Sequence, residues 1–537
     1  MTKEKKNGFK IELLFLIIVF AIGILTSFSY GSYLDEQIEK GILYSNVYEY
    51  ARHLIPNAGI TKDFAANEIV PISEAIDRDH GVALFYPISF IYEIEKTNIH
   101  LGSQIWHIYT FILVYLGMLC MYFAVKKLYD KPYIAIVSVL LFWFTPRMFA
   151  ESHYNNKDMV LLAAFMAVMY FGLRVYSETK WLDVILFSLS GAIAMNIKIV
   201  GAWPFAVMGI AAFVKLVASK KFDKKILIKM IACIVLWALI FVLITPACFG
   251  GVINFFKYLI EFALDYSRWN DYVLYDGKML FHNVTGTPHK YLLRMIVITT
   301  PLIHLALALA GIGGIIINLL SKKKEKIKPA LMTLIFLLCG MVPLGFAVVS
   351  GTRVYNGWRH FYFVYPSLIM LMTFGFWFIS ESIKGKANMI PYIVISSYLL
   401  IIAAGIGINY PNECCYYNIL AGKNIEERYE LDYWDLSIYE AEKFILKNEE
   451  GTVSIGSLNA PTGWGIDRNY DRLSNSLKSR IEIVEPEDYT NAEYIIVNTT
   501  YAFMYSSDKY DEIKKDYILV KKIKSYGNTV CEVYKKQ

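Results

Sequence analysis

Asp35 and Glu36 are adjacent carboxylates that come just after the first hydrophobic segment, residues 13–30. A carboxylate within hydrogen-bond reach of a hydroxyl or an amine can take its proton as a general base. Two neighbouring carboxylates also disfavour each other's ionised form, which favours proton transfer near neutral pH. The pair is therefore a candidate catalytic base, while an interfacial charge pair at a helix end is the alternative interpretation.

Three further clusters combine cations with carboxylates or histidines. Arginine binds phosphate oxygens through two hydrogen bonds, and lysine acts as a point charge. Such cations could stabilise a phosphate leaving group, with Arg147, Lys157, Arg359 and His360 as the first candidates. For the cluster of Arg78, Asp79 and His80, a salt bridge within the loop before a proline turn is an equally good explanation. The candidate substrate-binding residues are Arg78, Asp79 and His80, then Arg147, His153, Lys157 and Asp158, and finally Arg359 and His360.

The elements that must position these residues are long apolar runs. Of the 537 residues, 56% are hydrophobic and only 19% are charged, against about 25% charged in soluble proteins. A membrane-spanning helix needs about 20 apolar residues, and lipid offers no partner to an unpaired backbone. An integral membrane protein is therefore predicted. The runs without Asp, Glu, Lys or Arg are 13–30, 101–125, 230–256, 295–321, 329–352, 361–380 and 389–411.

Residues 132–214 are harder to divide, because their uncharged runs are shorter. We interpret 132–146, 159–173, 184–197 and 199–214 as four more spans, with two of them as re-entrant segments in the alternative interpretation. The prediction is an α-helical polytopic membrane protein with about eleven transmembrane helices.

Lysine placement predicts the orientation, because positively charged loops stay on the cytoplasmic side. With eleven spans, the lysines of the N-terminus and of alternate connectors all fall on one side, which places the N-terminus in the cytoplasm. The segments expected outside the cell membrane are 31–100, 147–157, 248–294, 351–360 and the residues after 411. The lysines concerned include Lys3, Lys5, Lys6, Lys10, Lys126, Lys127, Lys131, Lys215, Lys220, Lys221, Lys322, Lys323, Lys384 and Lys386.

The composition changes after residue 411, which divides the chain into a membrane module, 1–411, and a tail, 412–537. The tail mixes short strand-like runs with helical patterns and turn signals, so we expect a small extracytoplasmic α/β domain. Strands are predicted at 452–455, 494–497 and 517–520, helices at 438–447 and 510–515, and turns at 461–465 and 527–528.

The order of these motifs resembles a known family. Asp35-Glu36, then DHG…FYP, SHYNNKD and GWRHFYFVYPSL, are similar to the GT-C glycosyltransferases, in particular the family-39 group around the dolichyl-phosphate-mannose–protein mannosyltransferases and the bacterial aminoarabinose transferase. YPNECCYYNILAG followed by ELDYWDLSIYEAEKFI resembles bacterial members. The resemblance covers residues 12 to about 445. At 81–83 the sequence differs from many relatives, which have a proline-rich turn after the histidine, so the resemblance supports a role for His80 less than it supports the other residues.

The resemblance implies a GT-C-like fold and a glycosyltransferase. The donor would be a polyprenyl-phosphate-linked monosaccharide, and an acidic residue of the first outer loop would be the base, here Asp35 with Glu36 as neighbour. The transfer would be an inverting single displacement to an extracytoplasmic acceptor, which could be a protein, a cell-wall polymer or a glycolipid. Its partners are the carrier-linked sugar, the bilayer and the acceptor, with no nucleic acid. A divalent metal could be held by Asp35, Glu36, Asp79 and Asp158.

Two other classes of function stay open at this stage. A lipid-linked-sugar flippase or transporter would carry ionisable residues within its spans and internal repeats. The only candidate for such a residue is His304, and no repeat is evident. A non-catalytic envelope-assembly scaffold would use the polar loops for structure alone.

Overall fold

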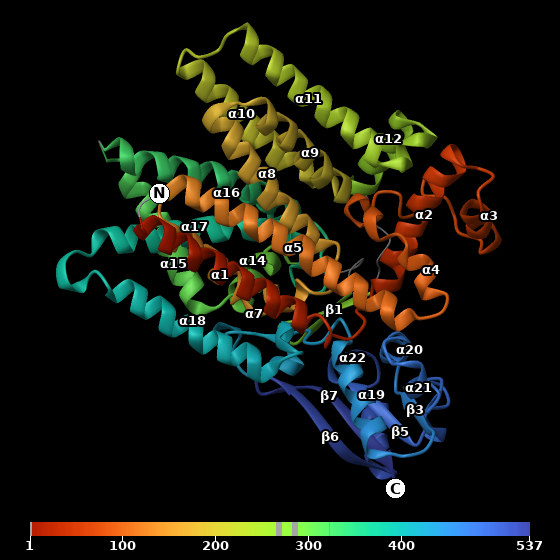
Figure 1. The fold of residues 1–537 in the computed structure, drawn as a ribbon. Coiled ribbons are helices and arrows are strands. Elements are labelled where there is room, and N and C mark those ends of the chain that lie inside the picture. The colour runs from red at the N-terminus through yellow and green to blue at the C-terminus, as the bar shows by residue number, and fades with distance from the viewer. Residues whose placement is uncertain (1–2, 265–270, 282–287, 322) are drawn as a thin grey trace.

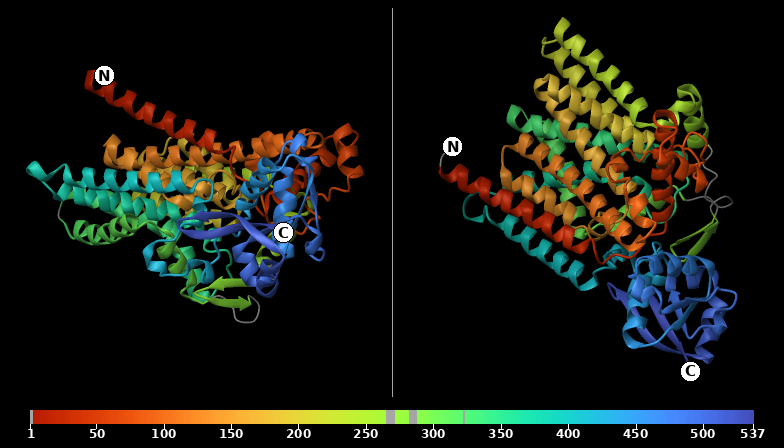
Figure 2. Two further views of the ribbon diagram at one scale, coloured as in Figure 1. Left: turned by 90° about the horizontal axis from the view of Figure 1, so that it is seen from below. Right: turned by 45° about the vertical axis from the view of Figure 1, so that its right-hand side comes forward.

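The computed structural model describes residues 3–264, 271–281, 288–321 and 323–537. Lys322 and two segments of the expected outer loop 248–294, namely 265–270 and 282–287, lie outside the described residues. The long helices form the body of the molecule, and a small sheet with its own helices forms a lobe beyond one end of them (Figure 1). Figure 2 shows this lobe at the C-terminus, on the far side of the helices from the N-terminus.

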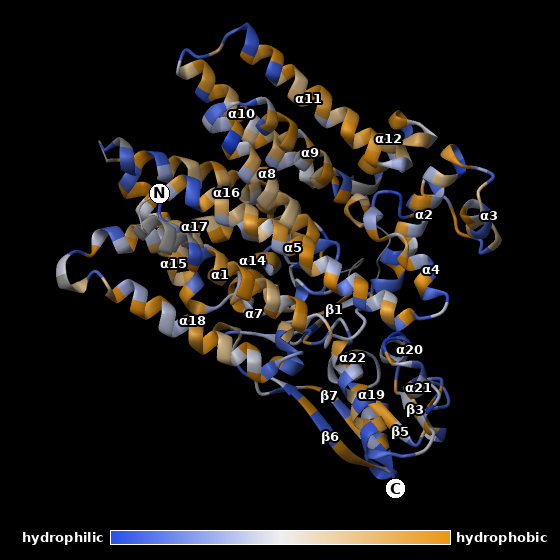
Figure 3. Ribbon diagram, viewed as in Figure 1, coloured by the Kyte–Doolittle hydropathy of each residue, from blue (hydrophilic) through white to orange (hydrophobic). Residues whose placement is uncertain are grey.

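The body is built of apolar helices. Within the described residues, eight helical segments are long and apolar enough to cross a membrane, and two shorter apolar helices, α6 and α9, accompany them. Figure 3 shows hydrophobic residues following these helices, as a multi-pass membrane protein requires. The count of about eleven spans stays a prediction. The eight long segments contain α5 (Ile99–Tyr129), α8 (Asp158–Glu178), α10 (Ala202–Ala218), α11 (Lys224–Ile244), α15 (Leu302–Leu319), α16 (Lys324–Ser350), α17 (Tyr365–Ser382) and α18 (Ile390–Asn409), and the two shorter helices are α6 (Pro132–Trp143) and α9 (Trp181–Ile197). The N-terminal helix α1 (Lys3–Thr26) precedes them.

Two of the predicted apolar runs are interrupted by proline. The run 230–256 stops being α-helical at Ile244, before Pro246, and the run 295–321 is broken at Thr300, before Pro301. Proline lacks the backbone N–H and pushes the preceding residue out of the α region. The run 230–256 therefore gives three helical elements, α11, η3 (Pro246–Gly250) and the start of α12 (Val252–Leu264), and the run 295–321 gives two, the end of α14 (Tyr291–Thr299) and α15.

Glycine allows the closest helix packing. An added Cβ at Gly375 of α17 would lie 2.0 Å from the carbonyl oxygen of Leu307 on α15, and one at Gly311 would lie 2.4 Å from the carbonyl oxygen of Leu371. The two backbones therefore touch where the glycines face each other, which is how helices associate in lipid. This contact packs the middle of α17 against α15, and η4 (Arg359–Val364), which carries part of the site described below, leads directly into α17.

The lysine-bearing connectors and the predicted outer segments lie at opposite ends of the helices (Figure 1). At the lysine end, Lys127 pairs with Glu178 at 3.3 Å and Lys131 pairs with Glu381. The structure thus has the two-sidedness that the lysine pattern predicts. Which side faces the cytoplasm stays a prediction.

The opposite end carries short elements between the long helices. They place the polar clusters of the sequence against the C-terminal lobe. These elements are α2 (Glu36–Leu54), α3 (Gly59–Ala66), η1 (Ala83–Ile88), α4 (Ile91–Glu95), α7 (Pro146–Glu151), η2 (Ile199–Gly201), η3 (Pro246–Gly250), α12 (Val252–Leu264), β1 (Tyr272–Tyr275), β2 (Lys278–Phe281), α14 (Tyr291–Thr299), η4 (Arg359–Val364), η6 (Glu413–Cys415), η7 (Ile419–Ala421) and η8 (Ile425–Glu427). At the lysine end, η5 (Gly385–Ala387) joins α17 to α18.

The C-terminal lobe contains a five-stranded mixed sheet in the order β4-β3-β5-β7-β6. β3 pairs in parallel with β4 and β5, while β7 pairs antiparallel with β5 and β6. The three predicted strands are present as β3, β5 and β6. The elements are α19 (Leu436–Asn448), β3 (Val453–Ser457), α20 (Ala460–Asp471), α21 (Asn475–Lys478), β4 (Ile481–Ile483), η9 (Tyr489–Asn491), β5 (Tyr494–Asn498), α22 (Thr499–Tyr505), α23 (Ser507–Glu512), η10 (Ile513–Lys515), β6 (Tyr517–Ser525) and β7 (Asn528–Lys536).

One turn prediction for the tail is wrong and the other is confirmed. Residues 461–465 lie inside α20, because Asn459 caps this helix by accepting a hydrogen bond from the Thr462 N–H at 3.0 Å. Pro461 occupies the first turn, where its missing N–H costs nothing. Gly527, with φ of +85°, lies in the turn that joins β6 to β7.

Candidate active site

Asp35 and Arg359 form an ion pair where the first outer segment meets the start of α17. Asp35 immediately precedes α2, and Arg359 begins η4. Arg359 Nη1 donates a hydrogen bond to Asp35 Oδ2 at 3.0 Å. The Asp35 side chain is 30% exposed, whereas that of Arg359 is only 6% exposed. The pair therefore presents an accessible carboxylate over a buried cation.

Asp158 and Lys198 extend this pair. Asp158, the first residue of α8, has Oδ2 3.8 Å from Arg359 Nη1 and accepts a hydrogen bond from Lys198 Nζ at 2.6 Å. Lys198 lies in the break between α9 and η2, and the only sequence signal for it is a single charge between two apolar runs. We name Asp35, Asp158, Lys198 and Arg359 the open cluster.

The guanidinium of Arg359 is enclosed by aromatic rings. Its central carbon lies 4.5 Å from the ring centroid of Trp434 and 5.2 Å from that of Tyr355. Within the described residues, neither Nε of Arg359 nor Nε1 of Trp434 has a hydrogen-bond partner. Buried donors without partners are costly, so these two N–H groups favour an acceptor from a ligand. The sequence marked the motif around Trp434 but not its contact with Arg359.

Glu36, although adjacent to Asp35, belongs to another cluster. Its carboxylate accepts a hydrogen bond from Ser103 at 2.6 Å and lies 2.8 Å from Lys40 Nζ and 3.0 Å from His107 Nε2. Burial opposes its ionisation, but Lys40 and His107 outweigh this and hold its pKa well below the usual value. Glu36 is fully buried. We name Glu36, Lys40, Ser103 and His107 the closed cluster.

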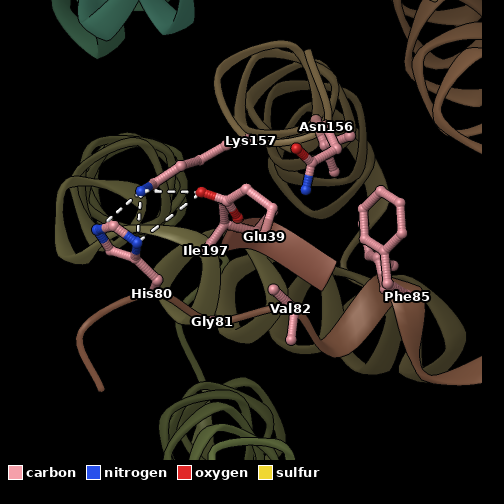
Figure 4. A pocket seen from close by; sticks show the side chains of 10 residues that line it. Glu39, His80, Gly81, Val82, Phe85, Asn156, Lys157 and Ile197 are labelled. Carbon is pink, nitrogen blue, oxygen red and sulfur yellow. Dashed lines mark hydrogen bonds and ion pairs between the residues drawn. The ribbon is translucent and has the colours of Figure 1, made fainter. Parts of the chain in front are cut away.

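A third group lies one helical turn beyond Asp35. Glu39 lines a small pocket together with His80 and Lys157 (Figure 4). Lys157 Nζ lies 3.3 Å from Glu39 Oε1, 2.6 Å from His80 Nδ1 and 2.7 Å from its Nε2. Burial raises the pKa of Glu39, and the charge of Lys157 opposes this rise. His80 Nε2 also lies 3.3 Å from Asp79. Three of the predicted residues thus meet here around Glu39, which the sequence did not indicate.

Arg147 approaches the same lobe segment from another side. It is buried, and its Nη1 donates to the hydroxyl of Tyr433 at 3.5 Å. Nε and Nη2 of Arg147 have no hydrogen-bond partner among the described residues. Glu151 accepts hydrogen bonds from Tyr362 and Tyr433, and burial raises its pKa while Arg147 opposes the rise. Arg147 and Arg359 therefore flank neighbouring aromatic residues, and each has unused donors.

Two of the predicted substrate-binding residues, His153 and Arg78, lie away from the open cluster, and a third, His360, has one ring nitrogen without a hydrogen-bond partner in the described chain. His153 is fully buried between α1 and α5, with Nε2 2.8 Å from Thr26 Oγ1 and its ring stacked on Phe111. The structure therefore assigns His153 to helix packing instead of phosphate binding. Arg78 donates to the carbonyl of Ser73 at 3.3 Å and stays within the outer segments. His360 packs edge-on against Tyr355, and its Nε2 has no hydrogen-bond partner in the described chain.

The carboxylates named as metal candidates do not form a ligand set. Asp35 pairs with Arg359, Glu36 with Lys40, and Asp158 with Lys198. Among the residues that the structure describes, no three His, Cys, Asp or Glu side chains are grouped to hold an ion. A cation beside each carboxylate opposes a divalent ion, so the donors do not fit one and we assign no metal.

Residues 79–249 match the family model described as "Dolichyl-phosphate-mannose-protein mannosyltransferase". Two crystal structures of ArnT from Cupriavidus metallidurans, in the apo state and bound to undecaprenyl phosphate, each align with 97% of this chain and 97% of their own at 12% identity. Their TM-scores are 0.47 and 0.46. No curated protein matches the chain. The family match, which includes Arg147, Asp158 and Lys198, confirms the predicted resemblance to the family-39 group.

Proposed function

We propose that the protein is a membrane glycosyltransferase that moves a monosaccharide from a polyprenyl-phosphate carrier to an extracytoplasmic acceptor. One observation carries the proposal. An accessible carboxylate, Asp35, lies 3.0 Å from a buried arginine, Arg359, that still has an unused donor. The match of residues 79–249 to the dolichyl-phosphate-mannose-protein mannosyltransferase model supports a lipid phosphate as the leaving group.

The proposed transfer is a single displacement. The Asp35 carboxylate accepts the proton of the acceptor hydroxyl or amine, and the acceptor atom attacks the anomeric carbon. The bond between that carbon and the phosphate oxygen breaks, and its electron pair leaves with the phosphate. Arg359, with Lys198 close by, stabilises the charge that develops there. Attack opposite the leaving group inverts the anomeric centre.

Asp35 is the better candidate for the base than Glu36. Glu36 is fully buried, and its carboxylate is already bound by Lys40, Ser103 and His107. A base must reach the proton that it accepts. In the structure Arg359 holds Asp35, so a phosphate that takes over the guanidinium would release the carboxylate for the acceptor.

The test is a transfer assay with purified protein in lipid vesicles. Supplied with a polyprenyl-phosphate sugar and cell-envelope extract, the protein should release polyprenyl phosphate. Asp35→Asn should reduce the rate by at least about 100-fold, because it removes the base. Asp63→Asn is the matched control, since Asp63 forms a surface ion pair with Lys96 at 2.6 Å on the same outer segment. Absence of release by the unaltered protein, or equal rates for the two variants, contradicts the proposal.

The proposed location of the site is the extracytoplasmic face of the cell membrane, with the N-terminus in the cytoplasm. A cysteine introduced at position 35 should react with a membrane-impermeant thiol reagent added outside intact cells. Reaction only after the membrane is opened would place the whole site on the cytoplasmic side.

The transporter alternative gains no support from His304, because its Nε2 lies 2.9 Å from the carbonyl oxygen of Leu141, as in a packing contact between helices.

A further inference from the structure

A second cleft lies in the C-terminal lobe, apart from the open cluster. Its volume is ≈ 410 Å³, within the range of about 300–1,000 Å³ that ligand pockets occupy. It is lined by residues from the starts of α20 and α23 and the end of α22, and by residue 271, which precedes β1. Six of its lining residues carry the argument and define the lobe cleft: Asp271, Asn459, Trp464, Glu487, Tyr505 and Lys509.

The lobe cleft exposes two aromatic rings on ordered helices. Trp464 of α20 is 57% exposed, and Tyr505 at the end of α22 is 36% exposed. Trp and Tyr combine a large apolar face with a polar tip. Sugar rings present apolar C–H faces that stack on such rings and hydroxyl edges that need hydrogen-bond partners. The lining also includes the apolar residues Leu458, Ala460, Pro461 and Pro486. Together with the two rings they offer a surface on which the C–H faces of a sugar can pack, while the polar lining residues can meet its hydroxyl groups.

The polar residues of the cleft carry charges of both signs. Asp271 and Glu487 offer carboxylate oxygens, which accept hydrogen bonds from hydroxyl groups; Asp271 Oδ1 also accepts one from the Tyr272 N–H at 2.7 Å. Lys509 contributes three donors, one of which reaches the carbonyl of Leu458 at 3.4 Å. Two acids and one base give no excess of positive charge for an anionic ligand. A neutral polyhydroxyl ligand matches this set.

Both aromatic residues lie on helices that also contact the candidate active site. On α20, Asn469 Oδ1 accepts a hydrogen bond from the backbone N–H of Ser32 at 2.9 Å, three residues before Asp35. On α22, the hydroxyl of Tyr501 donates to the carbonyl of Tyr433 at 2.9 Å, next to Trp434. Trp464 and Asn469 are five residues apart, about 8 Å along a helix. These buried contacts pack the two helices that border the lobe cleft against the segments that carry Asp35 and Trp434.

We propose that the lobe cleft binds the carbohydrate of an extended glycan acceptor and holds the chain so that one of its hydroxyl groups reaches Asp35. This inference rests on the proposed transferase function and names the acceptor class. The protein would then extend or decorate a polysaccharide or the glycan of a glycolipid. The observations that carry it are the exposed Trp464 and Tyr505, the flanking carboxylates and the connection through α20 and α22.

Trp464→Ala tests the cleft in the transfer assay. The KM for the cell-envelope acceptor should rise roughly 3- to 10-fold, the loss expected for one aromatic stacking contact. The KM for the polyprenyl-phosphate sugar and the rate at saturating acceptor should not change. Trp181→Ala is the matched control, because Trp181 is 49% exposed at the opposite end of the helices. An unchanged acceptor KM in Trp464→Ala overturns the inference while leaving the transferase function intact.

A binding measurement separates this inference from the proposed function. The Asp35→Asn protein, which cannot transfer, should bind immobilised cell-envelope polysaccharide, and adding Trp464→Ala should weaken that binding. Periodate treatment of the polysaccharide should abolish binding, and protease treatment should not. Binding that resists periodate but is lost after protease treatment assigns the cleft to a peptide and overturns the inference.

Discussion

The open and closed clusters differ in how completely their charges are satisfied. In the closed cluster, Glu36 is fully buried and its oxygens meet a lysine, a serine and a histidine. In the open cluster, Asp35 is partly exposed. Nη1 of Arg359 lies near the carboxylates of both Asp35 and Asp158, while its Nε has no hydrogen-bond partner in the described chain. The carboxylate and the ammonium of the closed cluster are paired, although His107 Nδ1 has no hydrogen-bond partner among the described residues. In the open cluster it is the buried guanidinium itself that keeps an unpaired N–H, and such a group is costly to leave unpaired. In our proposal the adjacent residues Asp35 and Glu36 therefore have different roles: Asp35 acts in catalysis, and Glu36 stabilises the fold.

The largest expected effect lies in the open cluster. Arg359→Lys keeps the charge but loses the planar fork that binds Asp35 and, in our proposal, the phosphate. We expect the transfer rate to fall by about 100- to 1,000-fold, as when one donor to a developing oxyanion is removed, with little change in melting temperature. A rate within a few fold of the unaltered protein would remove the functional difference between the clusters.

The closed cluster should respond in the opposite way. Glu36→Ala leaves Lys40 and His107 without their shared partner, which should reduce the free energy of unfolding by about 3 kcal/mol. The transfer rate per folded molecule should change only a few fold. Thermal unfolding in detergent measures the first quantity, and the vesicle assay measures the second. A 100-fold loss of rate with unchanged stability would reassign Glu36 to catalysis.

The pH dependence of the closed cluster has a definite sign. The pKa of Glu36 is held below its usual value, so its ionised form stabilises the fold above the unfolded-state pKa of about 4.3. That contribution should disappear as the pH falls below this value and through the folded-state pKa. Melting temperatures of the unaltered protein and Glu36→Ala should therefore converge in acid. A constant difference would show that the ionised carboxylate contributes nothing.

A smaller effect is expected at Glu430, in the segment that leads to Trp434. Burial raises its pKa to about 8, so the folded state retains a proton that the unfolded state loses above about pH 4.3. Stability should fall as the pH rises from about 4.3 to about 8. Glu430→Gln should melt roughly 2–4 °C higher than the unaltered protein near pH 9 and match it near pH 5. An equal pH slope in both proteins would contradict the prediction.

The sequence predicts elements better than contacts. Long uncharged runs and strand-like runs gave the helices of the body and three strands of the lobe, because burial in lipid or in a sheet needs a continuous apolar pattern. The turn expected at 461–465 failed because Asn459 and Pro461 are also the signal of a helix start. Local signals of this kind have more than one structural meaning.

The candidate site could be predicted only in part. Asp35, Asp158 and Arg359 stand out as polar groups beside apolar runs, and the structure brings them together. Trp434 and Glu39 could not be recognised, since an aromatic residue or an acid in an outer segment has many possible roles. The sequence also could not show that Asp35 and Glu36 belong to different clusters, because the partners of Glu36 include Ser103 and His107, which lie more than 60 residues away in the chain.

The position of Trp434 has a consequence for the order in which the protein becomes competent. This residue lies in the lobe, where Asn498 and Tyr501 donate hydrogen bonds to the carbonyls of the two residues that precede it, Asp432 and Tyr433. The sheet behind these contacts is completed by β7, which inserts between β5 and β6. Tyr355 can cover one side of the Arg359 guanidinium early, but Trp434 takes its place over the guanidinium only when the lobe has folded, and this requires the last strand of the chain, β7.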